Sequence, residues 1–156
     1  MTPPVAWLLI LQLVLGPTLV PGSYLKDAIK VFQHLYIDFP RVEFEDAFQG
    51  YCNGVMGYVR GIMNRWDCPK IHYLVHVPFK TIRKYCKRSQ NFCESYNQYC
   101  TMTTDSFPLT ICELTNYQLP INCQYNSTLT NQKLYLLCSS RYNAEPIDII
   151  GVVWGF

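Results

Sequence analysis

Residues 123–138 read CQYNSTLTNQKLYLLC, a run rich in Tyr, Thr and Leu that lies between two cysteines. Residues of these types favour strands, and the run predicts one strand over Ile121–Thr128 and another over Leu134–Ser139. The ranges Tyr96–Thr104 and Leu109–Thr115 have a similar composition and are also predicted to be strands. We therefore expect the C-terminal half of the chain to be a sheet.

The N-terminal half is predicted to be mainly helical. Apolar residues recur at helical spacing before residue 36, and helices are predicted over Tyr24–Tyr36, Tyr51–Met63 and Phe79–Arg88. One strand, Ile71–Val77, is predicted between the second helix and the third. Helices followed by strands are typical of an α+β domain.

The chain has 156 residues, which is enough for one domain. Its formal net charge of +2 excludes a strong polycation and a strongly acidic protein. Residues 1–22 contain no charged side chain. They include an apolar run, which is followed by Val20-Pro21-Gly22. This pattern predicts a secretory signal peptide over residues 1–22 and a secreted domain over residues 23–156. An uncleaved anchor is the alternative, and nothing after Ser23 is long and apolar enough to span a bilayer.

The cysteines are even in number and all follow residue 22: Cys52, Cys68, Cys86, Cys93, Cys100, Cys112, Cys123 and Cys138. In an oxidising compartment such a set predicts a disulfide framework. Zinc sites favour cysteines two to four residues apart, whereas the closest ones here are seven apart. We therefore predict no metal and no cofactor. Spacing alone does not decide which cysteines pair.

The cysteine intervals from Cys68 onward are 18, 7, 7, 12, 11 and 15. Together with Tyr51-Cys52-Asn53, Val75-His76 and Cys123-Gln124-Tyr125-Asn126-Ser127-Thr128, they resemble the pancreatic-type ribonuclease (ribonuclease A) superfamily over residues 23–156. The resemblance implies an α+β, ribonuclease A-like fold in which three helices pack against an antiparallel sheet. It also implies four disulfides, which are Cys52–Cys112, Cys68–Cys123, Cys86–Cys138 and Cys93–Cys100.

The resemblance also implies where catalytic residues should stand. The family cleaves RNA with a histidine from the first helix, a lysine just after the second cysteine and a histidine from the last strand. In place of the family's Pro-Val-His-Phe-Asp, this chain has Pro146-Ile147-Asp148-Ile149-Ile150, and no histidine follows His76. Aspartate is anionic at neutral pH and has no proton to give. The general acid is therefore predicted to be absent.

The other two catalytic positions also differ. The family's Cys-Lys-Pro is replaced by Cys68-Pro69-Lys70, and strand alternation predicts that Lys70 points away from the site. The base-reading Thr of the family is replaced by Tyr73. Gln33-His34-Leu35 resembles the family's Gln-His-Met, but His34 lies 18 residues before Cys52, a longer separation than in the family. His34 is either a degenerate catalytic residue or an ordinary helix histidine.

His34, Lys70 and Asp148 thus stand at degenerate catalytic positions. We therefore predict that the chain has no catalytic residue and no ribonuclease activity. His76 matches a family histidine outside the catalytic trio and is predicted to be a hydrogen-bonded structural residue.

Two surface features remain. Cations recur along one predicted helix face, at Lys80, Arg83, Lys84, Lys87 and Arg88. This stripe could bind a polyanion, although an ordinary solvated helix face is the favoured interpretation. Asn126-Ser127-Thr128 is a glycosylation sequon, and Asn126 is predicted to carry a glycan. The alternative is that the sequon stays unmodified, because sequons inside regular strands are less accessible.

The chain is thus predicted to be a secreted, monomeric, inactive ribonuclease-fold protein that binds an extracellular protein or a polyanion, with weak nucleic-acid binding possible. A weak nuclease or a cationic host-defence protein is the alternative.

Overall fold

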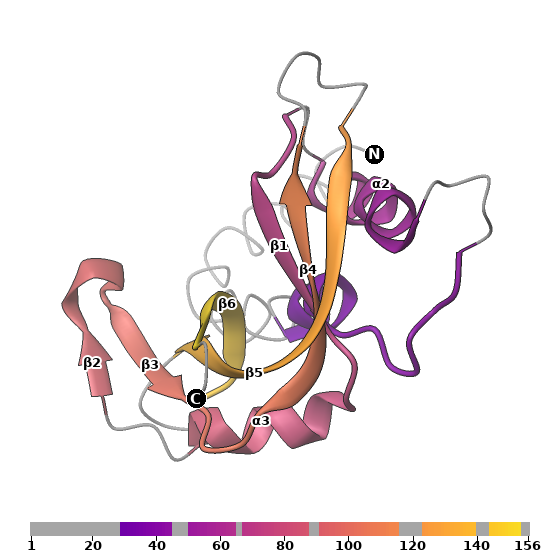
Figure 1. Cartoon of the computed structure of the whole chain (residues 1–156). Helices are drawn as coiled ribbons and strands as arrows, with labels where there is room; N and C mark the ends of the chain where they lie inside the picture. Colours follow the sequence, from indigo (N-terminus) through magenta and orange to yellow (C-terminus); the bar gives the residue numbers. More distant parts are fainter. Residues whose placement is uncertain are drawn as a thin grey trace, which may run out of the picture.

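The computed structural model describes residues 29–44, 50–64, 67–87, 91–115, 123–139 and 144–153 (Figure 1). Residues 29–36 are helical, α2 covers Tyr51–Met63 and α3 covers Phe79–Lys87. The predicted signal peptide and the predicted start of the first helix lie outside the described residues. Three helices stand against an antiparallel sheet, which confirms the α+β, ribonuclease A-like class.

Six strands form the sheet: β1 (Ile71–Val75), β2 (Asn91–Cys93), β3 (Gln98–Met102), β4 (Phe107–Leu114), β5 (Tyr125–Cys138) and β6 (Pro146–Val153). Their order is β1-β4-β5-β3-β2, and β6 also pairs with β5. A short 3-10 turn, η2 (Glu94–Tyr96), joins β2 to β3. Strand β2 was not predicted, because its three residues are too few to show alternation.

The two strands predicted within residues 121–139 are wrong in one respect, because residues 125–138 form the single strand β5. Its first half pairs with β4 as far as Gln132, and its second half pairs with β3 and β6. The polar residues in its middle include Thr130 and Asn131, and Asn131 is exposed. Their polarity reflects solvent contact along a continuous strand that changes partners, rather than a turn.

Two apolar clusters stabilise the fold. One contains Phe32 of the first helix, Ile82 of α3 and Leu134 of β5, and the other packs α2 on Leu74 and Leu114. Burial of this kind contributes roughly 25 cal/mol for each Å² of apolar surface removed from water. The clusters hold helices against two parts of the sheet, and β5 passes through both parts (Figure 1).

Helix α2 forms although it contains three glycines. Gly54 lies against the Phe44 ring, and a Cβ on Gly54 would lie 2.4 Å from the Cδ1 atom of Phe44. Glycine at position 54 lowers the helix propensity of α2, but it lets the helix backbone pack closely against the Phe44 ring. The helix ends at Asn64, whose left-handed backbone (φ 51°) lets its N–H bond the carbonyls of Arg60 and Gly61.

All four disulfides implied by the resemblance are present: Cys52–Cys112, Cys68–Cys123, Cys86–Cys138 and Cys93–Cys100. The first joins α2 to β4 and the third joins α3 to β5. Cys52, Cys86, Cys112 and Cys138 are fully buried. These two bridges thus connect α2 and α3 to the sheet across the hydrophobic core.

Candidate functional site: a degenerate catalytic cleft

A cleft of about 300 Å³ lies where β1, β6 and the first helix meet. Its walls are formed by Tyr36, Met63, Pro69, Ile71, His72, Tyr73, Asp148, Ile149 and Ile150. Three segments that are distant in the sequence therefore build one site. No Lys or Arg side chain is among these described lining residues, so the walls offer one carboxylate and no ammonium or guanidinium group to a phosphate.

Tyr36 and Asp148 are hydrogen-bonded to each other in the cleft, and the Tyr36 hydroxyl donates to Oδ1 of Asp148. Burial, with the Asp148 charge and hydrogen bond as further causes, raises the pKa of Tyr36 far above its ordinary value. The phenol therefore stays protonated at neutral pH and does not act as a base. The carboxylate of Asp148 is engaged as an acceptor, which is the opposite of the role of a general acid.

His34 does not contribute to this cleft. Its side chain is exposed and lines a separate groove of about 390 Å³ together with Val42 and Tyr58. The residue of the first helix that faces Asp148 is Tyr36, and His34 is an exposed helix histidine, which was the second of its two interpretations. The helical period explains this: Phe32 is fully buried, and Tyr36, four residues later, lies on the same face.

His72 is a cleft residue for which the sequence indicated no role. Its Nε2 lies 2.7 Å from the Leu35 carbonyl oxygen, so this nitrogen carries the hydrogen and donates. The ring stacks on Tyr36 with centroids 4.9 Å apart. Burial lowers the pKa of His72, against the opposing effects of the Leu35 carbonyl and Asp148. His72 is therefore a neutral ring that orients Tyr36.

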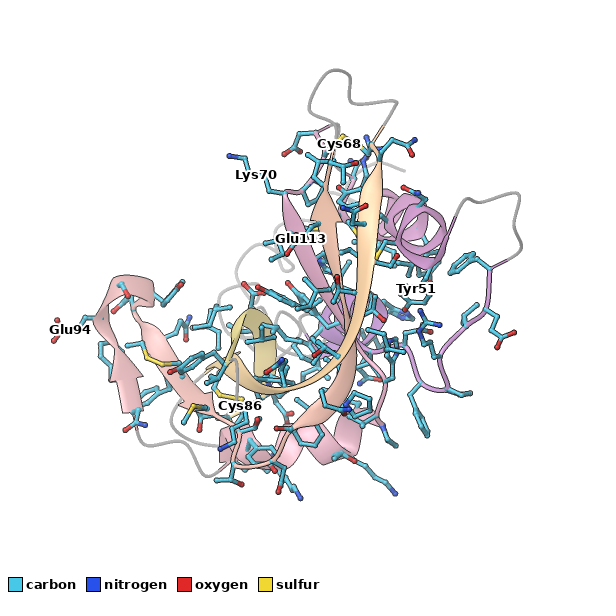
Figure 2. All side chains as sticks on the ribbon, in the orientation of Figure 1. Tyr51, Cys68, Lys70, Cys86, Glu94 and Glu113 are labelled. Carbon is cyan, nitrogen blue, oxygen red and sulfur yellow. A yellow bond between two sulfur atoms is a disulfide. The ribbon has the colours of Figure 1, made fainter. Side chains whose placement is uncertain are left out.

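Lys70 is exposed and is not part of the cleft wall. Figure 2 shows its side chain pointing outward, just before the start of β1 at Ile71. Pro69 and Ile71, its neighbours on either side, line the cleft instead. Tyr73, at the base-reading position, also lines the cleft, and burial followed by the charge of Glu113 raises its pKa.

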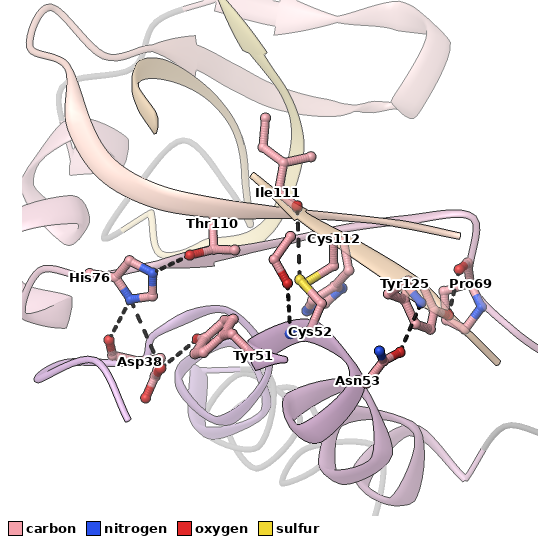
Figure 3. The surroundings of a disulfide bond; sticks show 12 residues. Asp38, Tyr51, Cys52, Asn53, Pro69, His76, Thr110, Ile111, Cys112 and Tyr125 are labelled. Atoms are coloured by element: carbon pink, nitrogen blue, oxygen red, sulfur yellow. Dashed lines mark hydrogen bonds and ion pairs between the residues drawn. A yellow bond between two sulfur atoms is a disulfide. The ribbon is translucent and has the colours of Figure 1, made fainter. Parts of the chain in front are cut away.

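His76 has the structural role that was predicted for it. Its Nδ1 lies 2.8 Å from the Asp38 carbonyl oxygen, and its Nε2 lies 2.7 Å from Thr110 Oγ1 (Figure 3). Tyr51 donates to Oδ2 of the same Asp38 at 2.5 Å. Burial lowers the pKa of His76. The group joins α2, β1 and β4 beside the Cys52–Cys112 disulfide and away from the cleft.

Two cations of the basic stripe on α3 pair with a buried carboxylate, while their own side chains stay exposed. Arg83 binds the buried Glu145 carboxylate through two nitrogens, at 2.6 to 2.9 Å, and Lys87 lies 3.3 Å from it. Lys80 and Lys84 are exposed, and Arg88 lies outside the described residues. The local excess of positive charge that polyanion binding requires is therefore smaller than the sequence indicated.

The comparison with known proteins shows the family of the chain. The pattern described as "Pancreatic ribonuclease" matches residues 27–150. The chain belongs to the pancreatic ribonuclease family. It is similar to the Mus musculus protein named "Probable inactive ribonuclease-like protein 13", with 59% identity over 97% of this chain and 99% of that one. The Homo sapiens protein of the same name is 57% identical over 99% of both chains.

Among solved structures of the family fold, green turtle egg white ribonuclease superposes with a TM-score of 0.64. The superposition covers 81% of this chain and 98% of the turtle protein, at 24% identity, and it shows the shared fold. Within the described residues, no helix is long and apolar enough to cross a membrane, and no cluster of three or more His, Cys, Asp or Glu side chains could hold a metal ion.

Proposed function

We propose that this member of the pancreatic ribonuclease family is a secreted protein that does not cleave RNA and acts by binding an extracellular partner. The hydrogen bond from Tyr36 to Asp148 carries the first part of the proposal. Transphosphorylation needs a base for the 2′-hydroxyl proton, an acid for the 5′-oxygen and a cation for the phosphorane. In this cleft, the Tyr36 phenol stays protonated and donates to the Asp148 carboxylate, so this pair offers neither the acid nor the cation.

Two further observations support the proposal. The Mus musculus and Homo sapiens relatives carry "inactive" in their names, in agreement with the prediction that the chain is not an enzyme. Four disulfides in a small domain are typical of proteins that fold in an oxidising compartment. Residues 1–22 also support secretion, because their uncharged, apolar sequence is typical of a signal peptide. A stable fold whose cleft lacks the catalytic groups can still bind a partner, and we therefore propose a binding role.

Digestion of poly(C) by the refolded, disulfide-intact chain tests the inactivity. We expect no cleavage above that of a mock preparation, because losing a single acid or base costs roughly 10²–10⁴ in rate, and no histidine follows His76 to serve as the acid. Turnover near that of an active family member would contradict the proposal. The Asp148→His variant tests the reason: it restores one group only, and we expect it to remain inactive.

Weak residual cleavage is a second candidate, favoured by the presence of one histidine, His72, in the cleft wall. Its Nδ1 is the ring nitrogen that could accept a proton, since Nε2 donates to Leu35. Activity that is lost in His72→Ala and kept in His34→Ala would establish this candidate. Activity kept in both variants would indicate a contaminating nuclease, because the described cleft holds no other histidine.

The binding role is tested by capture of ligands from extracellular fluid on the immobilised, oxidised chain. The matched control is the same chain after reduction and alkylation, which removes the fold and keeps the composition. A saturable partner that binds the oxidised chain alone is expected. Equal capture by both forms would contradict a folded binding surface. Polyanion binding is tested separately by comparing the salt concentration that elutes the parent chain and the Lys80→Ala/Lys84→Ala variant from heparin. Because contacts to polyanions are sensitive to salt, earlier elution of the variant would indicate polyanion binding by these lysines.

A further inference from the structure

The sequon residues Asn126 and Thr128 lie in the first half of β5, where the strand pairs with β4. Asn126 stands opposite Glu113 of β4, and Glu113 stands opposite Ile71 of β1. In the next row, Thr128, Ile111 and Tyr73 are aligned in the same way. Cross-strand partners project from the same face of a sheet. Asn126 and Thr128 therefore share a face with Ile71 and Tyr73, two of the three β1 residues of the cleft wall.

The middle residue of the sequon points to the opposite face. Ser127 Oγ accepts the backbone N–H of Cys52 at 2.9 Å, so its hydroxyl is held against the start of α2. Asn126 and Thr128 are both exposed. Glu113, between Asn126 and Ile71, lies on the side of the sheet away from α2 (Figure 2). The amide and the hydroxyl of the sequon thus project into solvent together, over the cleft side of the sheet.

We propose that Asn126 carries an N-linked oligosaccharide and that this glycan covers the β1 wall of the cleft. The inference rests on the proposed secretion, since the donor is a lipid-linked oligosaccharide of the secretory pathway. In the transfer, a bond forms between Nδ2 of Asn126 and C1 of the first sugar. The bond from C1 to the lipid diphosphate breaks, the diphosphate leaves, and the amide nitrogen loses a proton.

The spacing of the strands makes this coverage effective. Two interstrand steps separate Asn126 from Ile71, which corresponds to roughly 10 Å, and an N-linked glycan is bulky and hydrated. Ile71 is 46% exposed, so an apolar side chain at the cleft mouth lies within its reach. A polymer such as RNA would have to displace the sugar to lie along this face. The surfaces of α2 and of the β2–β3 hairpin remain open to a partner.

Expression in a secretory eukaryotic cell, followed by peptide-N-glycosidase treatment, tests the attachment. We expect a loss of mass on treatment and conversion of Asn126 to aspartate in the peptide that contains it. Thr128→Ser keeps the sequon and should keep the glycan, whereas Thr128→Ala removes the sequon and should abolish the glycan with little effect on this exposed position. An unmodified Asn126 in the secreted chain would overturn the proposal.

Hydroxyl-radical footprinting tests the coverage on the wild-type chain before and after enzymatic deglycosylation. Oxidation of Ile71 and Tyr73 is expected to rise at least about twofold when the sugar is removed. Tyr58 on α2 and Phe92 on β2 are 59% and 50% exposed and serve as internal controls that should not change. Equal oxidation of Ile71 and Tyr73 in both forms would overturn the coverage. Poly(C) digestion by the deglycosylated chain keeps this result separate from the inactivity proposal, which predicts no cleavage in either form.

Discussion

Tyr36 and His34 lie two residues apart on the first helix and have opposite environments. The local string Gln33-His34-Leu35 drew attention to the histidine, whereas the buried anchor Phe32 determines which later residue reaches the cleft. Counting four residues from Phe32 would have selected Tyr36 from the sequence, because residues i and i+4 share a helix face. Its contact with Asp148 could not have been predicted, since 112 residues separate the two in the chain.

The two buried histidines predict how stability depends on pH. Burial lowers the pKa of both His72 and His76 below the ordinary value of about 6.5. As pH falls, the unfolded chain therefore binds protons before the folded chain does. The free energy of unfolding should reach its full value above about pH 6.5 and decrease below that pH. The slope should be at most about 1.4 kcal/mol per pH unit for each histidine. Urea denaturation from pH 7.5 to pH 5 measures this slope.

The exposed His34 is the matched control for this titration. His34→Gln should keep the slope, because its side chain is in solvent in both states, whereas His76→Gln should make the slope shallower. An unchanged slope in His76→Gln would show that His76 does not cause the acid sensitivity.

At the scale of elements, helix α3 has exposed cations that form ion pairs with a buried glutamate of the same chain. Its apolar residues Ile82 and Cys86 are buried, as the helical period predicted. Its cations were expected to lie on a solvated face, and Arg83 and Lys87, which are 45% and 41% exposed, also bind the buried Glu145 just before β6. The sequence did not indicate this pairing, because Glu145 lies 62 residues from Arg83. The ion pairs fix the entry of β6, the strand that carries Asp148.

Removing the Arg83 side chain tests this connection. Arg83→Ala leaves Glu145, whose side chain is 4% exposed, with Lys87 as its remaining cation. We expect a loss of about 1–3 kcal/mol, because a buried carboxylate loses its bidentate donor. Lys80→Ala, an exposed change on the same helix, should alter stability by less than about 0.5 kcal/mol. Equal effects in urea denaturation would show that the ion pair does not stabilise the fold.

At the scale of the whole molecule, the disulfides should differ in what they contribute. Cys86–Cys138 closes a separation of 52 residues and Cys93–Cys100 one of 7. The loop-entropy relation gives roughly 4 kcal/mol for the long loop and about 2.5 kcal/mol for the short one. Replacing both cysteines of a pair by alanine, followed by thermal denaturation, should lower Tm more for the first pair. The opposite order would contradict this expectation. Cys86 and Cys138 are also fully buried, and their loss leaves a void in the core.

The sequence by itself determined the resemblance to the family and the absence of a histidine near the C-terminus, because both are read from residue types and their spacing. The pairing of the cysteines came from that resemblance, since spacing alone leaves the pairing open. The tertiary structure decided which helix residue faces Asp148, that β5 is one strand shared by both parts of the sheet, and that Asn126 stands on the cleft face. Each of these depends on strand register and on contacts between distant segments, and such contacts form only when the hydrophobic core brings those segments together.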